Sequence, residues 1–142
     1  MNYERKVQQV SPDSALGKHM LCAFLCGGLI CVIGQALGQW YQSMGASVER
    51  AGTLASVSLI FLAILLTGLG QFDNLARFGG AGFLVPITGF ANAMSAPAMD
   101  YRNEGMVLGI GANLFKIAGP VLVYGLSAGV FYGIILYLIS LF

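Results

Sequence analysis

The chain has 142 residues, of which 57% are hydrophobic and only 9% carry a charge. Soluble domains carry roughly 25% charged residues, so this composition excludes an ordinary water-soluble domain and predicts several membrane-spanning segments. The formal net charge is +1, which offers no basic surface for nucleic acid. The length predicts one compact membrane domain.

The N-terminal part predicts a short soluble tail followed by a first spanning helix. Residues 1–17 are polar and lack the apolar centre of a cleavable signal peptide, so we expect one transmembrane domain at 18–142. Residues 20–41 are apolar and end at Trp40 and Tyr41, an aromatic pair typical of a membrane–water interface. They predict the first membrane-spanning helix.

The three cysteines, Cys22, Cys26 and Cys31, all lie in this first apolar segment. Cys22 and Cys26 share a helical face, where two thiolates could bind a soft metal ion. No histidine or acidic residue joins them inside the segment. We therefore interpret them as small buried hydrophobic side chains and expect no metal or cofactor.

A polar loop is expected at 42–52, followed by a second helix at 54–69 that glycines can end. The next stretch, 78–97, is uncharged but is interrupted by glycines and prolines at Gly79, Gly80, Gly82, Pro86, Gly89 and Pro97. Non-helical backbone at membrane depth survives only where protein buries it or where it lines a water-filled cavity. The stretch therefore predicts part of a pathway, which either crosses the membrane or enters and returns.

The C-terminal part is apolar from residue 105 onward, except for Asn113 and Lys116. A single helix over 105–142 would be about 57 Å long, whereas the hydrocarbon core is about 30 Å thick. A break at Gly119–Pro120 is expected, because proline cannot continue the hydrogen-bond ladder. We predict a half-helix at 105–117 and a full span at 120–141. The fold class is thus all-α, a polytopic membrane protein with four to five transmembrane segments including a broken or re-entrant one.

The positive charges predict the orientation of the N-terminus. Arg5, Lys6 and Lys18 are concentrated at the N-terminal end, while each later loop holds one basic residue. Basic residues near spans are retained in the cytoplasm, so the N-terminus is expected on the cytoplasmic side.

Lys116 is the one charged residue deep in a predicted membrane segment. An ionisable group in hydrocarbon costs about 2.5–3.5 kcal/mol on insertion scales, so it usually faces a partner or a wet cavity. Lys116 could pair with Asp73, Asp100 or Glu104, could contact an anion, or could extend to the interface as a lysine near a helix end.

Other polar groups and helix breaks extend this candidate pathway. Thr88, Asn92 and Ser95 are four and three residues apart and share one helical face, either lining a polar path or bonding one helix to another. The candidate solute pathway consists of Lys116, Asn113, Thr88, Asn92, Ser95, Pro86, Gly82, Gly119 and Pro120. Three acidic residues, Asp73, Asp100 and Glu104, are candidate mouth charges that attract Ca²⁺, or else ordinary solvated loop charges. No acid, base and nucleophile set is present, so an enzyme is not expected.

Several motifs are similar to those of the SpoVA membrane proteins of spore-forming bacteria, AC-type members above all, with AE-type members of similar design. They are AFLCGGLICVIGQ (23–35), LLTGLGQFD (65–73), GGAGFLVPITGFANAMSAPAMDY (79–101) and EGMVLGIGANLFKIAG (104–119). The block from Gly80 to Asn92 is the most specific. The N-terminal tail departs from the family pattern, since it is short and lacks an early Pro-Lys-Pro run.

The resemblance implies a role in moving dipicolinic acid, with Ca²⁺, across the inner membrane of the spore. The solute would enter the forespore during sporulation and leave at germination, through a channel that membrane tension opens. The implied partners are other SpoVA proteins and membrane lipid, in a homo- or hetero-oligomer, with the N-terminus on the core side. The alternative is a structural or docking subunit of the SpoVA complex without its own pore. The resemblance implies no residue-level site.

Overall fold

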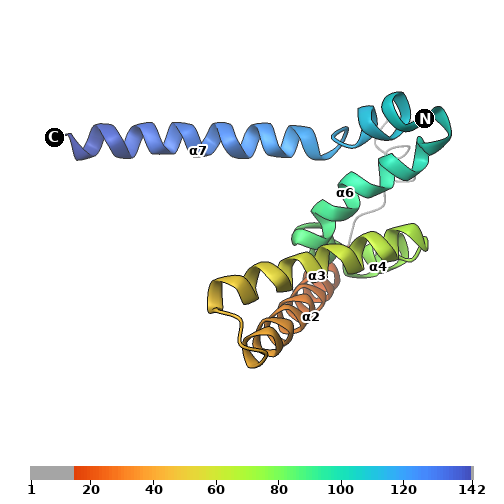
Figure 1. Ribbon diagram of the computed structural model, residues 1–142, viewed down its shortest axis with the longest axis horizontal. Helices are drawn as coiled ribbons and strands as arrows, with labels where there is room; N and C mark the ends of the chain where they lie inside the picture. The colour runs from red at the N-terminus through yellow and green to blue at the C-terminus, as the bar shows by residue number, and fades with distance from the viewer. Residues whose placement is uncertain (1–14, 142) are drawn as a thin grey trace, which may run out of the picture. The chain divides into compact units, whose positions relative to one another are not determined.

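The computed structural model describes residues 15–141, and within this range every regular element is helical (Figure 1). The all-α prediction is therefore confirmed. The first 14 residues of the predicted tail lie outside the described residues. The first described helix, α2, spans Leu16–Ser43 and so begins a few residues before the predicted start.

Three helices of the described part are long and apolar enough to cross a membrane. They are α2, α3 (Val48–Gly68) and α7 (Ala118–Ser140). Each corresponds to a predicted span, but the prediction of four to five spans is not confirmed. The elements between α3 and α7 are shorter, since the longest of them, α6 (Ile87–Asp100), has 14 residues.

The start of α3 corrects the predicted loop at 42–52, because residues 48–52 are helical. Two interactions explain why a charged stretch can begin this helix. The backbone N–H of Arg50 donates to the Ser47 hydroxyl at 3.4 Å, and Glu49 lies in the first turn, where a negative charge is favourable.

The contacts divide the molecule into two compact units, and α3 contributes to both. In its described part, the first unit holds residues 15–59 and 73–86, and the second holds residues 60–72 and 87–141. The first unit contains α2, the first half of α3, most of α4 (Phe72–Gly79) and the short α5 (Ala81–Leu84).

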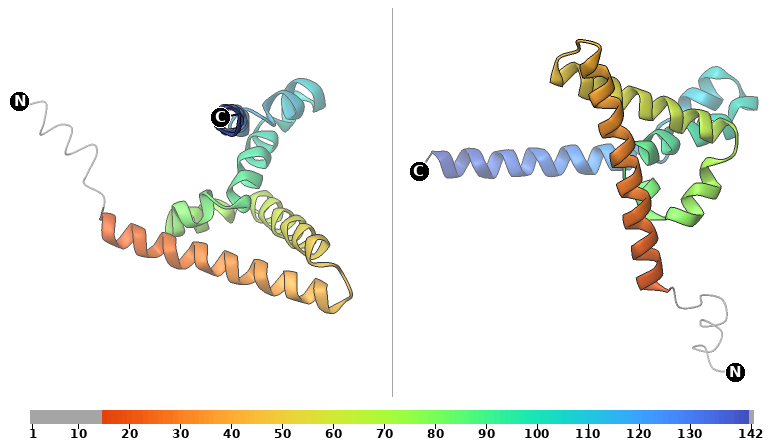
Figure 2. Two further views of the ribbon diagram at one scale, coloured as in Figure 1. Left: turned by 90° about the vertical axis from the view of Figure 1, so that its left-hand side faces the viewer. Right: turned by 90° about the horizontal axis from the view of Figure 1, so that it is seen from below.

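The first unit is held together by a close backbone contact between α5 and α2 (Figure 2). Gly82 is buried, and a Cβ added there would meet the carbonyl oxygen of Ala23 and lie 2.8 Å from the backbone nitrogen of Gly27. Gly80 has φ 51°, a conformation that glycine adopts freely, and it separates α4 from α5. The glycines of this segment thus serve a turn and a tight helix contact.

The α2 helix also contacts the first half of α3. The Tyr41 hydroxyl lies 2.8 Å from the Ser58 hydroxyl, in hydrogen-bond contact. A Cβ added at Gly34 would lie 3.3 Å from the Leu59 side chain. The aromatic residue predicted at the membrane interface therefore also bonds to the neighbouring helix.

The second unit contains the rest of α3, the α6 helix, a 3₁₀ turn η1 (Arg102–Glu104), a π-helix η2 (Met106–Gly111) and α7. Much of the stretch 78–97 that the sequence predicts as broken is helical. Its interruptions lie at Gly80 and at Val85–Pro86, whereas Pro97 lies inside α6.

The predicted half-helix at 105–117 is replaced by the π-helix and a turn at 114–117. The predicted break at Gly119–Pro120 therefore lies slightly earlier in the chain. Pro120 stands in the first turn of α7, where a missing N–H removes no intrahelical bond. The proline marks the start of the last helix.

Candidate functional site

Lys116 lies in the turn that precedes α7, and its side chain is exposed. Its Nζ donates a hydrogen bond to the Tyr101 hydroxyl at 2.7 Å and lies 4.3 Å from the centroid of the Tyr101 ring. Within residues 15–141 this ammonium group forms no ion pair. Tyr101 was not among the partners expected for Lys116, because a separation of fifteen residues across two irregular elements follows no helical period.

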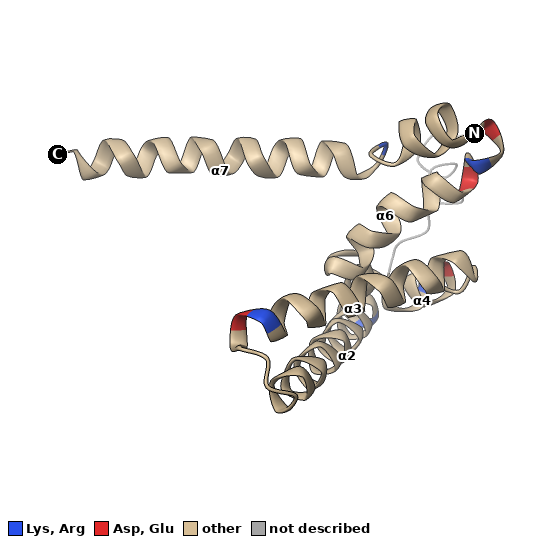
Figure 3. Ribbon diagram, in the orientation of Figure 1, with Lys and Arg blue, Asp and Glu red and all other residues tan. Residues whose placement is uncertain are grey.

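The candidate mouth charges all lie at exposed positions near helix ends (Figure 3). Asp100 is the last residue of α6, Glu104 ends η1, and Asp73 lies in the first turn of α4. Asp100 and Glu104 belong to the same unit as Lys116, whereas Asp73 belongs to the other. The α7 helix carries no charged residue.

The polar residues of α6 are largely enclosed by protein. Thr88 and Ser95 are buried, and Asn92 is half-buried. The Thr67 hydroxyl donates to Asn92 Oδ1 at 2.8 Å, which joins α3 to α6, and it also lies 2.8 Å from the Ala63 carbonyl oxygen. The Ser95 hydroxyl donates to the Ala91 carbonyl oxygen at 2.8 Å.

Asn113 is half-buried and stabilises the irregular backbone before α7. Its amide Nδ2 donates to the carbonyl oxygen of Gly109 at 2.9 Å. Gly109 itself is buried, and a Cβ there would meet the carbonyl oxygen of Tyr101. This part of the chain is therefore positioned against the end of α6 by backbone contacts.

The remaining pathway candidates are divided between the two units. Gly82 and Pro86 belong to the first unit. Gly82 packs so closely against the backbone of α2 that even a Cβ atom would not fit there. Gly119 and Pro120 lie in the first turn of α7 in the second unit. The second unit therefore contains most of the predicted pathway residues, namely Thr88, Asn92, Ser95, Asn113, Lys116, Gly119 and Pro120.

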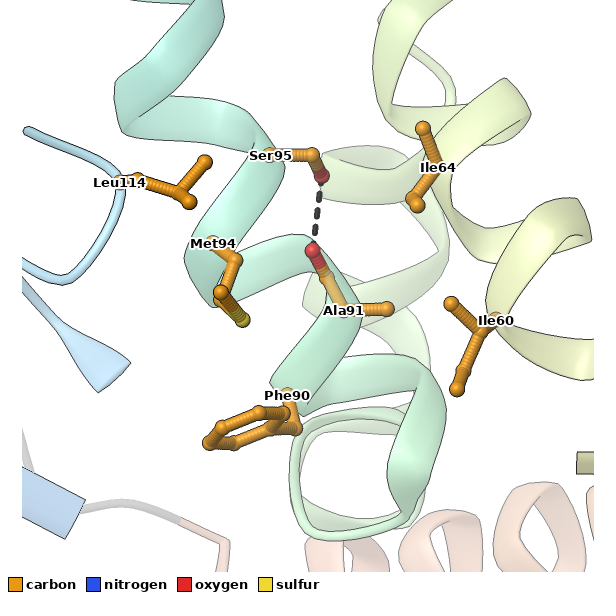
Figure 4. Close-up of a pocket in the computed structure, with 7 residues that line it drawn as sticks. All are labelled: Ile60, Ile64, Phe90, Ala91, Met94, Ser95 and Leu114. Carbon is orange, nitrogen blue, oxygen red and sulfur yellow. Dashed lines mark hydrogen bonds between the residues drawn. The ribbon is translucent and has the colours of Figure 1, made fainter. Parts of the chain in front are cut away.

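A pocket of about 260 Å³ lies in the second unit between α3, α6 and the residues before α7 (Figure 4). Its lining is apolar except for the Ser95 hydroxyl, which is bonded to the Ala91 carbonyl oxygen. The residues that line it are Ile60, Ile64, Phe90, Ala91, Met94, Ser95 and Leu114. Apart from Ser95, none of these was a predicted site residue, because apolar residues on separate helices give no motif.

The cysteines of α2 differ in their surroundings. Cys26 is buried, Cys22 is half-buried and Cys31 is exposed. Over the range that the structure describes, no three or more histidine, cysteine, aspartate or glutamate side chains gather as a metal ion would require.

Comparison with known proteins gives two matches. Residues 19–135 match the model of the SpoVAC/SpoVAEB sporulation membrane protein family. The chain is 43% identical to stage V sporulation protein AC of Bacillus subtilis (strain 168) over 135 residues, which cover 94% of this chain and 90% of that protein. No solved structure matches the chain.

Proposed function

This chain belongs to the SpoVAC/SpoVAEB family of sporulation membrane proteins, and we propose that it is a channel subunit for dipicolinic acid. The solute moves with Ca²⁺ across the spore inner membrane, inward during sporulation and outward at germination. Membrane tension opens the path. Other SpoVA proteins are the proposed partners in a homo- or hetero-oligomer.

The observation that carries this proposal is the position of Lys116. Its ammonium group has no acidic partner among residues 15–141 and is held by the Tyr101 hydroxyl at 2.7 Å. It lies directly before α7, whose first N–H groups form the positive end of the helix dipole. A cation beside a helix N-terminus favours binding of a solute with two carboxylates. The exposed carboxylates of Asp100 and Glu104 are negatively charged and so attract Ca²⁺.

We also propose a topology with three spans, in which the stretch 78–97 enters the membrane and returns. The 14 residues of α6 rise about 21 Å, which is short of a hydrocarbon core about 30 Å thick. With the N-terminus on the core side, three spans place the C-terminus on the opposite side. A single cysteine at Ser140, in a background lacking the native cysteines, should react with an impermeant maleimide only from that opposite side.

Solute flux through reconstituted protein tests the channel proposal. The full chain, alone and together with other SpoVA proteins, is placed in liposomes loaded with calcium dipicolinate, and efflux is followed under osmotic downshift. The proposal fails if neither preparation releases solute faster than protein-free liposomes. Lys116→Ala should reduce dipicolinate efflux, Lys116→Arg should retain part of it, and the matched control Lys18→Ala should leave it unchanged.

The second candidate function is a docking subunit without its own pore. The hydrogen bond from Thr67 to Asn92 favours the docking role, because Asn92, a predicted pathway residue, here bonds α6 to α3. Single cysteines along 86–95 distinguish the two functions. Labelling by a water-soluble reagent in the open state supports a path there, and uniform protection supports the docking role.

A further inference from the structure

The apolar pocket of the second unit has a defined depth along α3. The 21 residues of α3 rise about 31 Å, close to the thickness of the hydrocarbon core. Ile64 and Ile60 lie four and eight residues before Gly68, the last residue of the helix, or about 6 and 12 Å from its end. When α3 spans the membrane, both pocket residues therefore lie within the hydrocarbon layer.

The chemistry of the pocket excludes water and polar solutes. An ordered water in a cavity needs two to four polar partners, and apolar cavities stay dry. The one polar side chain in the lining, Ser95, already donates to the Ala91 carbonyl oxygen at 2.8 Å (Figure 4). The pocket is therefore not a segment of the path proposed for calcium dipicolinate.

We propose that this pocket binds one acyl chain of a membrane lipid. It is partly open, lies at hydrocarbon depth and offers branched aliphatic, aromatic and thioether contacts from Ile60, Phe90 and Met94. Its volume of about 260 Å³ is just below the range of about 300–1,000 Å³ typical of small-molecule sites. It therefore accepts part of one chain and leaves the headgroup outside.

The proposed acyl chain lies between α3 and α6, because both helices line the pocket. The same two helices are joined by the Thr67–Asn92 hydrogen bond, and a Cβ added at Gly68 would lie 3.5 Å from Met99. A lipid chain between Ile60 and Met94 thus fills the gap beside these direct contacts. This site rests on the proposed topology, in which α3 spans the membrane, but it does not depend on whether the protein forms a channel.

Photolabelling in vesicles tests the proposal. The full chain is reconstituted in phosphatidylglycerol and phosphatidylethanolamine containing a phosphatidylcholine with a diazirine in one acyl chain. After irradiation, labelled residues are mapped by mass spectrometry. Labels on Phe90, Met94 or Leu114 support the site. Labels confined to α7 and other exposed helix faces, with these three residues unlabelled, overturn it and indicate that protein covers the pocket.

A pocket-filling variant provides the matched comparison. Ala91→Phe should lower labelling at Met94 about tenfold, the factor expected when two fewer methylene groups are buried. The control Ala128→Phe, on the exposed surface of α7, should leave labelling at Met94 unchanged. If Ala91→Phe does not fold, Leu114→Trp serves as a second pocket-filling variant, and the measured quantity is then the labelling of Phe90. Unchanged labelling in a folded pocket-filling variant overturns the proposal.

Discussion

Both the α2–α5 contact and the α7 helix contain glycines, but the glycines have different roles in the two regions. At Gly82 a side chain would strike the backbone of α2, so glycine is what allows the two segments to touch. In α7, a Cβ added at Gly125, Gly129 or Gly133 meets nothing within 4 Å. Small residues in a membrane sequence therefore indicate close packing only where a second backbone is present.

The largest expected effect is that of Gly82→Ala. The added methyl group would meet the Ala23 carbonyl oxygen and the Gly27 nitrogen, and backbone atoms cannot rotate away as a side chain can. Overpacking of this kind costs about 1–3 kcal/mol. Unfolding of the purified protein in mixed micelles should show this loss, and wild-type stability would contradict the packing of α5 on α2.

A smaller effect is expected for the polar contact between α3 and α6. In a double-mutant cycle, Thr67→Val and Asn92→Leu should give a coupling energy of about 0.6 kcal/mol, the average for side-chain hydrogen bonds between membrane helices. The cycle is read from the same unfolding transition. Strictly additive single effects would mean that the two side chains do not interact, and would remove the support that this bond gives to the docking role.

The smallest effect is expected in α7. Gly129→Ala should change the free energy of unfolding of the monomer by no more than about 0.5 kcal/mol, because the site is open on all sides. The measurement is made beside Gly82→Ala in the same micelles. A loss as large as that of Gly82→Ala would show that α7 is packed against another helix, and the contrast between the two regions would disappear.

Much of the outline follows from local patterns in the chain. Long apolar runs of sufficient length predict α2, α3 and α7 individually, because a spanning helix satisfies its backbone hydrogen bonds internally. The bounds were less accurate, since favourable interactions at a helix start, such as Glu49 in the first turn of α3, can include charged residues that hydropathy alone assigns to a loop.

The broken segments were harder to predict. Glycine and proline identify positions where a helix can stop, but they do not require it to stop. Pro97 lies inside α6, and Pro120 is accommodated in the first turn of α7. Pro120 fits a helix start, where no intrahelical bond is lost, whereas Pro97 is tolerated in a helix interior, where proline usually kinks or breaks a helix.

Composition and motifs are local properties of the chain, so they were enough to identify an all-helical membrane protein of the SpoVAC/SpoVAEB family. Which residues contact one another became known only from the folded structure. The contacts of Lys116 with Tyr101, Thr67 with Asn92, and Gly82 with α2 join residues far apart in the chain. No sequence period predicts such pairs, since they depend on how separate helices pack.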